Sequence, residues 1–301
     1  MYTSFRRQPT IKLFTMATDL NDKGLQQFKK TADKWGWDYD VFHLDKQIIK
    51  SANGVAQYKM ELLKYIWEHL KYNHYDFVGI VDGYDILINN SPDECIRRLY
   101  SANLHDGTLS IGVGASWNQL KPFSYLSMNK SIRNLLTQFN NTLSYSTNCK
   151  RTINLGMVLG SQSTVLFYIS KMLNLWHTIN NCNSDSCSEQ KYFEYLLDSN
   201  VFNCYNNTLY IDENEMFINN TNNCLLDLNH FSSNPIFLHF VGKRDKCDTF
   251  EYQTHFYNLI MNINCNTNCP VCYNKNQYMT FIWMVLIICF ILVCLYSKRF
   301  R

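Results

Sequence analysis

The stretch "DFVGIVDGYDILINNSP", Asp76 to Pro92, decides the fold of this chain. Its apolar run, Phe77 to Val81, has the length of a strand and no polar face, which is typical of the centre of a parallel sheet. Two carboxylates, Asp82 and Asp85, follow the run, and Tyr84 lies between them. Ligands of open α/β sheets bind beyond the carboxyl ends of the strands. The stretch therefore predicts an α/β fold whose ligand-binding edge carries acidic groups.

Strand-like and helix-like segments alternate on both sides of this stretch, as they do in an open α/β sheet. Helices are indicated by apolar residues at helical spacing, such as Met60, Leu63 and Trp67, and by the capping box of Ser91 with Glu94. The predicted strands span residues 10–18, 38–44, 76–81, 107–116, 152–161 and 234–242, and the predicted helices 21–36, 56–72, 92–100, 163–179 and 188–199. We expect an open, mostly parallel, Rossmann-like sheet flanked by helices.

The composition limits the class of protein and its compartment. The chain of 301 residues is 46% hydrophobic, enough for one sizeable core, and its net charge is only +3. Without a long basic cluster, we expect no nucleic-acid partner. The 12 cysteines favour an oxidising compartment with disulfides. The group "CNTNCPVC", Cys265 to Cys272, allows disulfides or zinc, but three thiols without a close histidine favour disulfides or unpaired thiols.

One uncharged segment, Tyr278 to Tyr296, is near the length of a membrane-spanning helix, about 20 residues. We predict a single-pass membrane protein of the endomembrane or secretory pathway. Its parts are a domain over residues 1–256, a Cys-rich stalk over 257–277, a transmembrane helix over 278–296 and a basic tail over 297–301. The basic tail favours a luminal main domain, whereas the first residues lack the apolar stretch of a signal peptide. The orientation stays open.

The pair Asp82 and Asp85 suggests a site for a divalent cation. Carboxylate oxygens suit Mg²⁺ or Mn²⁺, which proteins commonly hold with one or two carboxylates and substrate phosphates. With the ring of Tyr84 stacked on a base, a sugar nucleotide with a diphosphate fits all three residues. Two other interpretations compete. One is a plain acidic turn that caps a strand, and the other is a phosphotransferase with a nucleophilic aspartate, although the haloacid-dehalogenase pattern has one residue between its acids and this chain has two.

The segment "QYKMELLKYIWEHLKYNHYDFVGIVDGYDILINNSPDECIRRL", residues 57–99, resembles the N-terminal glycosyltransferase domain of the procollagen lysyl hydroxylases. Further segments resemble that domain in the same order: "TMATD" at 15–19, "GASW" at 114–117, "RTINLGMVLGS" at 151–161, "SEQKYFEYLL" at 188–197 and "IFLHFVGKRDK" at 236–246. The resemblance covers about Thr10 to Asp248. It implies a GT-A-type fold and a hexosyltransferase that uses Mn²⁺ and a UDP-sugar, either UDP-glucose or UDP-galactose.

The resemblance also implies roles for particular residues. The metal ligands would be Asp82, Asp85 and His239. The nucleotide side of the donor site would include Thr18, Lys59, Tyr84, Gly242 and Lys243. The sugar pocket and the catalytic groups would include Trp117, Asn154, Asp185 and Glu189. Taken singly, these residues have plainer interpretations, such as a core histidine for His239 or a solvated helix lysine for Lys59.

Departures from the family pattern leave the activity open. Ser188 replaces the first acid of an acidic pair, with Asp185 nearby as a substitute, and Phe240 adds bulk beside a predicted phosphate site. We find no iron-binding dioxygenase module and expect no lysine hydroxylation. We expect transfer of a hexose to a protein acceptor, either hydroxylysine or galactosyl-hydroxylysine of collagen-like chains. The alternative is a catalytically degenerate fold that serves as a membrane-displayed binding or structural protein.

Overall fold

The computed structural model describes residues 7–44, 54–113, 153–178, 189–199, 201–202, 209–212, 216–220, 234–240 and 249–261. The chain divides into two compact units, Met1–Gln253 and Thr254–Arg301. The predicted stalk begins inside a helix, α8 (Thr249–Ile260), and its residues after 261, the predicted transmembrane helix and the tail lie outside the described residues. Among the described helices, none combines the length and the apolar character that crossing a membrane requires.

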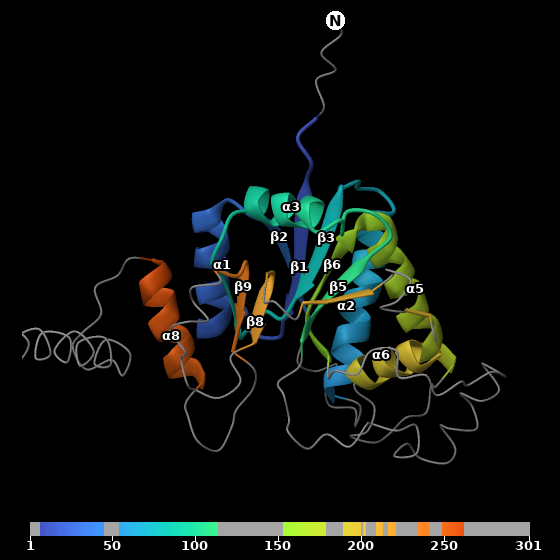
Figure 1. Ribbon diagram of the computed structural model, residues 1–301. Coiled ribbons are helices and arrows are strands. Elements are labelled where there is room, and N and C mark those ends of the chain that lie inside the picture. Colours follow the sequence, from blue (N-terminus) through green and yellow to red (C-terminus); the bar gives the residue numbers. More distant parts are fainter. Residues whose placement is uncertain are drawn as a thin grey trace, which may run out of the picture. The chain divides into compact units, whose positions relative to one another are not determined.

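Strands and helices alternate along the first unit and build two sheets (Figure 1). The strands are β1 (Ile11–Ala17), β2 (Asp38–His43), β3 (Phe77–Val81), β4 (Ile86–Ile88), β5 (Leu109–Val113), β6 (Ile153–Ser161), β7 (Leu209–Asp212), β8 (Ile218–Asn220) and β9 (Phe237–His239). The helices before α8 are α1 (Lys23–Trp35), α2 (Gly54–Leu70), α3 (Pro92–Ser101), α5 (Gln162–Thr178) and α6 (Glu189–Asp198). Every predicted strand and helix is present within a few residues of its predicted ends. Strands β4, β7 and β8 and helix α8 are additional to those that the sequence predicts.

The larger sheet has six strands in the order β2-β1-β3-β6-β5-β7. β1 pairs in parallel with β2 and β3, and β5 pairs in parallel with β7. Among the described strands of this sheet, only β6 runs against its neighbours, β3 and β5. The predicted mostly parallel sheet is therefore confirmed. The reversed strand places the first half of β6 beside the end of β3, where Val81 faces Met157.

Helices cover both faces of the larger sheet, with α1 and α3 on one face and α2, α5 and α6 on the other (Figure 1). Along the strands, neighbouring residues alternate between the two faces. Phe14 and Val78 belong to the buried cluster with α2 and α5, whereas Leu13 and Phe77 belong to the cluster with α1 and α3. All of β3 is buried. Its continuous apolar run follows from this position, because a central strand covered on both faces has no polar side.

Helix α1 begins and ends where the sequence indicates. The carboxylate of Asp22, the N-cap, accepts the amides of Gly24 and Leu25 at 2.8 and 3.3 Å. Gly36 ends the helix with a φ of 73°, in the left-handed region where a residue without Cβ meets least strain. These two local signals fix the length of α1 and the position of its first turn beside the site described below.

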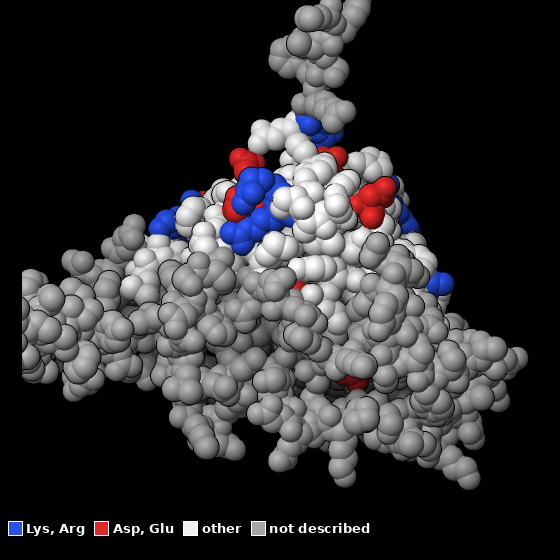
Figure 2. All heavy atoms as spheres, viewed as in Figure 1, with Lys and Arg blue, Asp and Glu red and all other residues white. Residues whose placement is uncertain are grey.

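Helix α3 has one half of the predicted capping box. The hydroxyl oxygen of Ser91 accepts the amide of Glu94 at 3.2 Å. The reciprocal half of the prediction is wrong, because the amide of Ser91 donates to Asn90 and the carboxylate of Glu94 turns to Arg97 and Arg98. Charged guanidinium groups are stronger partners for a carboxylate than one backbone amide. Figure 2 shows the resulting mixture of basic and acidic side chains over α3.

A second sheet, with the order β4-β9-β8, contains three strands. β4 begins directly after Asp85 and pairs antiparallel with β9, so that Ile86 faces His239. β8 pairs in parallel with β9. The pairing of β4 with β9 therefore brings a late segment of the chain to the acidic turn that follows β3.

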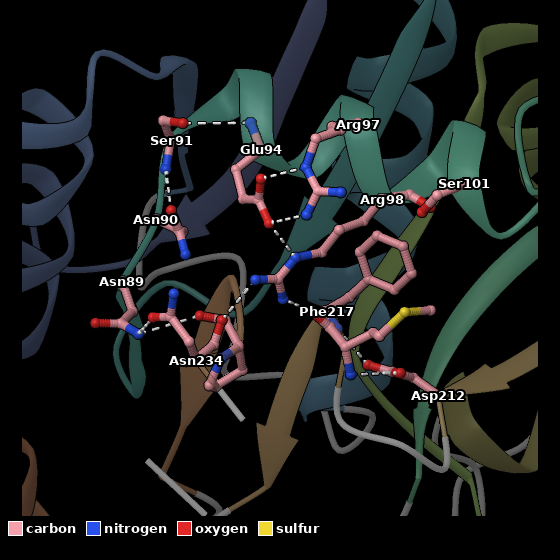
Figure 3. A network of polar contacts seen from close by, with 12 residues as sticks. Asn89, Asn90, Ser91, Glu94, Arg97, Arg98, Ser101, Asp212, Phe217 and Asn234 are labelled. Carbon is pink, nitrogen blue, oxygen red and sulfur yellow. Dashed lines mark hydrogen bonds and ion pairs between the residues drawn. The ribbon is translucent and has the colours of Figure 1, made fainter. Parts of the chain in front are cut away.

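Polar side chains with little exposure hold this small sheet in place (Figure 3). Arg98, 9% exposed, donates to Glu94 within α3, to the carbonyl of Met216 before β8, and to the carbonyl of Asn234 before β9 at 2.9 Å. Asp212 at the end of β7 is fully buried and accepts three backbone amides around the start of β8 at 2.6 to 2.8 Å. The small sheet is thus tied both to α3 and to the larger sheet.

Candidate metal centre

Two carboxylates and one imidazole converge at the carboxyl end of β3. Nε2 of His239 lies 3.5 Å from Oδ2 of Asp82 and 3.5 Å from Oδ2 of Asp85. One ligand atom from each of the three residues lies within 4.8 Å of the others. Asp82 follows β3, Asp85 precedes β4 and His239 ends β9. The structure therefore brings together the three residues that the sequence predicts as metal ligands.

Backbone hydrogen bonds fix the two aspartates. The amide of Asp82 donates to the carbonyl of Gly156 in β6 at 3.0 Å, and the amide of Phe240 donates to the carbonyl of Asp85 at 2.7 Å. Phe240, which departs from the family pattern, has a buried side chain. The imidazole of His239 is buried as well, whereas both aspartates are partly exposed. The three groups thus stand on ordered strand ends, which is the support that a metal site needs.

The positive charge of Lys59 faces the acidic pair from α2. Its ammonium forms an ion pair with Asp82. Burial by itself would raise the pKa of Asp85, but the charge and hydrogen bond of His239 and the charge of Lys59 outweigh it and hold that pKa below its ordinary value. Asp85 is therefore a carboxylate at neutral pH. Two carboxylate oxygens and an imidazole nitrogen at these distances fit a divalent cation.

The turn between the two aspartates is clamped to the end of β1. The hydroxyl oxygen of Tyr84 accepts the amides of Thr18 and Asp19 at 2.5 and 2.9 Å. The side chain of Gln253 donates to the carbonyl of Tyr84 at 3.0 Å. Gly24 in α1 lies so close to the same carbonyl that a Cβ there would overlap it. The predicted nucleotide residues Thr18 and Tyr84 are therefore in direct contact.

Two predicted residues of the sugar pocket lie near the start of β6. The amide oxygen of Asn154 accepts the backbone amide of Gly156 at 2.6 Å. Glu189 is the first residue of α6, and the next residue, Gln190, donates to the carbonyl of Ile153 at 2.9 Å. This bond places the start of α6 beside the start of β6. Because β6 is antiparallel to β3, these residues are at the same end of the sheet as the metal cluster.

Four predicted site residues lie outside the described residues, as does Ser188: Trp117, Asp185, Gly242 and Lys243. Conversely, Gly24 and Gly156 make close contacts at the site and are not among the predicted site residues. A signal exists for both, because glycine inside a helix or a strand costs stability and often marks the close approach of another group.

Comparison with known proteins shows similarity to a family of glycosyltransferase domains and to one solved structure. Residues 7–108 match the family described as PLOD GT domain. A crystal structure of a glycosyltransferase involved in the glycosylation of the major capsid of PBCV-1 is similar in fold, with a TM-score of 0.51 and 12% identity over 82% of this chain and 98% of that chain. No curated protein matches the sequence.

The family match over residues 7–108 supports a glycosyltransferase, and the similar crystal structure shows the same fold. More particularly, residues 7–108 are similar to the PLOD GT domain, in agreement with the first part of the resemblance seen in the sequence. The predicted mixed α/β fold is confirmed.

Proposed function

We propose that this protein is a metal-dependent hexosyltransferase that moves glucose or galactose from a UDP-sugar to a protein acceptor. The observation that carries the proposal is the convergence of Asp82, Asp85 and His239 at the edge of the sheet where α/β folds bind their ligands. We take the cation to be Mn²⁺, which the family resemblance implies and which carboxylate oxygens suit.

The chain's own residues would hold the donor around this cation. A cation held by Asp82, Asp85 and His239 would supply a Lewis acid for the negative charge of the diphosphate. Lys59 adds a positive charge for the same phosphates. Thr18 and Tyr84, joined at the end of β1, would take the nucleoside. Glu189, at the start of α6, would face the sugar.

For the acceptor we propose hydroxylysine or galactosyl-hydroxylysine of collagen-like chains. This part rests on the PLOD resemblance, and fold alone never fixes an acceptor. Membrane anchoring and an endomembrane location belong to the same proposal and rest on the sequence of Tyr278 to Tyr296.

The test is UDP release from UDP-glucose and UDP-galactose by the full chain in mild detergent, with Mn²⁺ and with or without a hydroxylysine-containing collagen peptide. Asp82→Ala and Asp85→Ala are the site variants. Glu68→Ala, an acid on the surface of α2 that pairs with Lys71, is the matched control. We expect metal-dependent release that falls at least about 100-fold in the site variants and stays unchanged in the control.

Two results would contradict the proposal. UDP release that persists without metal, or in both site variants, would contradict the assignment of Asp82 and Asp85 as metal ligands. Binding of UDP and Mn²⁺ by a folded protein that releases UDP from neither donor would favour the degenerate, binding-only alternative.

A further inference from the structure

Gly156 lies between the two strand ends that carry candidate ligands. It is in β6, and its carbonyl accepts the amide of Asp82, which follows β3, at 3.0 Å. Its α-carbon lies against the imidazole of His239, which ends β9. One glycine therefore contacts two of the three candidate ligands, although it offers no side chain to a metal.

The imidazole of His239 fills the space that a side chain at position 156 would need. A Cβ built there would overlap Cε1 of the ring and would lie 2.5 Å from Nδ1. Real Cβ atoms essentially never come within 3.0 Å of such neighbours. Because His239 is only 2% exposed, its ring can retreat only if the closely packed residues around it move.

The backbone of Gly156 is itself held on both sides. Its amide donates to the side chain of Asn154 at 2.6 Å, and its carbonyl accepts the amide of Asp82. A Cβ would also lie 2.7 Å from the amide oxygen of Asn154. Both polar backbone groups of Gly156 are hydrogen-bonded. The overlap caused by an added methyl group is therefore relieved more easily by a shift of the imidazole than by a shift of the strand.

We propose that Gly156 is a positioning residue of the metal centre. Its missing side chain sets how closely the His239 imidazole packs on β6, and so where Nε2 meets the carboxylates of Asp82 and Asp85. The inference rests on the proposed metal-dependent function, but the contact that carries it is present without any metal.

The first experiment is a double-mutant cycle on the thermal stability of the full chain without metal. It compares Gly156→Ala, His239→Ala and the double variant with the wild type. We expect Gly156→Ala to lower the unfolding temperature by several degrees in the wild-type background. In the His239→Ala background the loss should be much smaller, because only the close approach to Asn154 then remains. A merely disturbed strand would lose the same stability in both backgrounds.

The matched control is Gly160→Ala in the same strand. A Cβ at that position would lie 3.1 Å from the carbonyl oxygen of Thr108 and needs only a small adjustment. We expect its effect on stability to be small and equal with and without His239, because Gly160 makes no such close approach to the imidazole.

The second experiment is calorimetric titration of Mn²⁺ into the same proteins. We expect Gly156→Ala to weaken Mn²⁺ binding about tenfold or more, the usual effect of disturbing the support of a metal ligand. Gly160→Ala should bind Mn²⁺ like the wild type.

The outcomes separate this inference from the proposed function. Equal stability losses from Gly156→Ala in both backgrounds, or unchanged Mn²⁺ affinity in a folded Gly156→Ala protein, would overturn the inference. If the wild type binds no Mn²⁺, the proposed function fails, while the stability cycle still decides whether Gly156 makes room for His239. If Gly156→Ala does not fold alone, folding of the double variant supports the inference, and its failure to fold refutes it.

Discussion

Lys59 is paired with Asp82: an ammonium group on α2 contacts a carboxylate that we assign to the metal. The two side chains are 14% and 27% exposed, so the pair lies largely below the surface. Without a cation, the ammonium balances part of the charge of the acidic cluster. A cation that binds Asp82 must compete with this contact, and the released ammonium is then close to any phosphates that the cation holds.

We expect Lys59→Met to change two affinities in opposite directions. Mn²⁺ alone should bind more tightly, because its competitor for Asp82 is removed. UDP in the presence of Mn²⁺ should bind more weakly, because a positive charge beside the diphosphate is lost. Each change should be about tenfold, which corresponds to ~1.4 kcal/mol. Calorimetric titration of Mn²⁺, followed by UDP, measures both.

Lys64→Met provides the control for this prediction. Lys64 is on the same helix, but it pairs with Glu61 and its side chain is 40% exposed. Neither affinity should change in this variant. A Lys59→Met protein in which both affinities fall, or both rise, would contradict the competition between ammonium and cation.

Glu94 should make stability depend on pH in the acid range. Hydrogen bonds from Arg97 outweigh the opposing effect of burial and, with those from Arg98, lower the pKa of Glu94 from 4.5 to about 2. Because the pKa is lower in the folded state, the stabilisation is complete above the unfolded value and is lost as the pH falls through about 2. We expect Glu94→Gln to have a lower Tm than the wild type at neutral pH, with the two curves meeting near pH 2. A Tm difference that is constant with pH would refute this assignment.

Arg98 should matter far more for stability than its neighbour Arg97. Replacement by Met leaves the carbonyls of Met216 and Asn234 without this donor, at an expected cost of roughly 3 kcal/mol in the free energy of unfolding. Arg97→Ala removes an exposed partner of Glu94, which Arg98 still holds, and should cost less. Urea unfolding measures both variants. Similar costs for the two would mean that the bridge from α3 to the small sheet contributes nothing of its own.

The larger sheet can be predicted because its signals are local. The apolar run from Phe77 to Val81, the cap at Asp22 and the stop at Gly36 each act over a few residues. The small sheet cannot be predicted in this way. β4 and β8 have three residues each, too few for a periodic pattern, and although β9 lies within a predicted strand, its pairing with β4 depends on a contact between Ile86 and His239, which are far apart in the sequence.

The candidate site, like the fold, can be predicted from the sequence only in part. Residue type and spacing indicate the two aspartates, because carboxylates are themselves metal ligands, and the family resemblance adds His239. No pattern shows that Lys59 pairs with Asp82, or that Gly156 makes room for an imidazole. Such contacts depend on the folded arrangement of β3, β6, β9 and α2. Gly156 has no side chain whose chemistry could indicate its role, which is only to leave space for the imidazole.

Tyr84 has one role that the family resemblance implies and a second role that the structure indicates. The family resemblance assigns its ring to stacking on the base of the nucleotide. In the structure its hydroxyl oxygen also accepts the amides of Thr18 and Asp19, which follow β1. The hydroxyl therefore holds the segment that would line the nucleoside site, whatever the ring itself contacts.

We expect Tyr84→Phe, which keeps the ring, to weaken UDP binding about tenfold, because the amides of Thr18 and Asp19 lose their acceptor. Tyr84→Leu should weaken it about tenfold further, since base stacking is lost as well. Calorimetry with UDP at saturating Mn²⁺ measures both. Tyr39→Phe, which removes a more exposed hydroxyl bonded to Asp33, is the control and should bind UDP like the wild type. If Tyr84→Phe also matches the wild type, only the ring serves the nucleotide, and the hydroxyl bonds belong to folding alone.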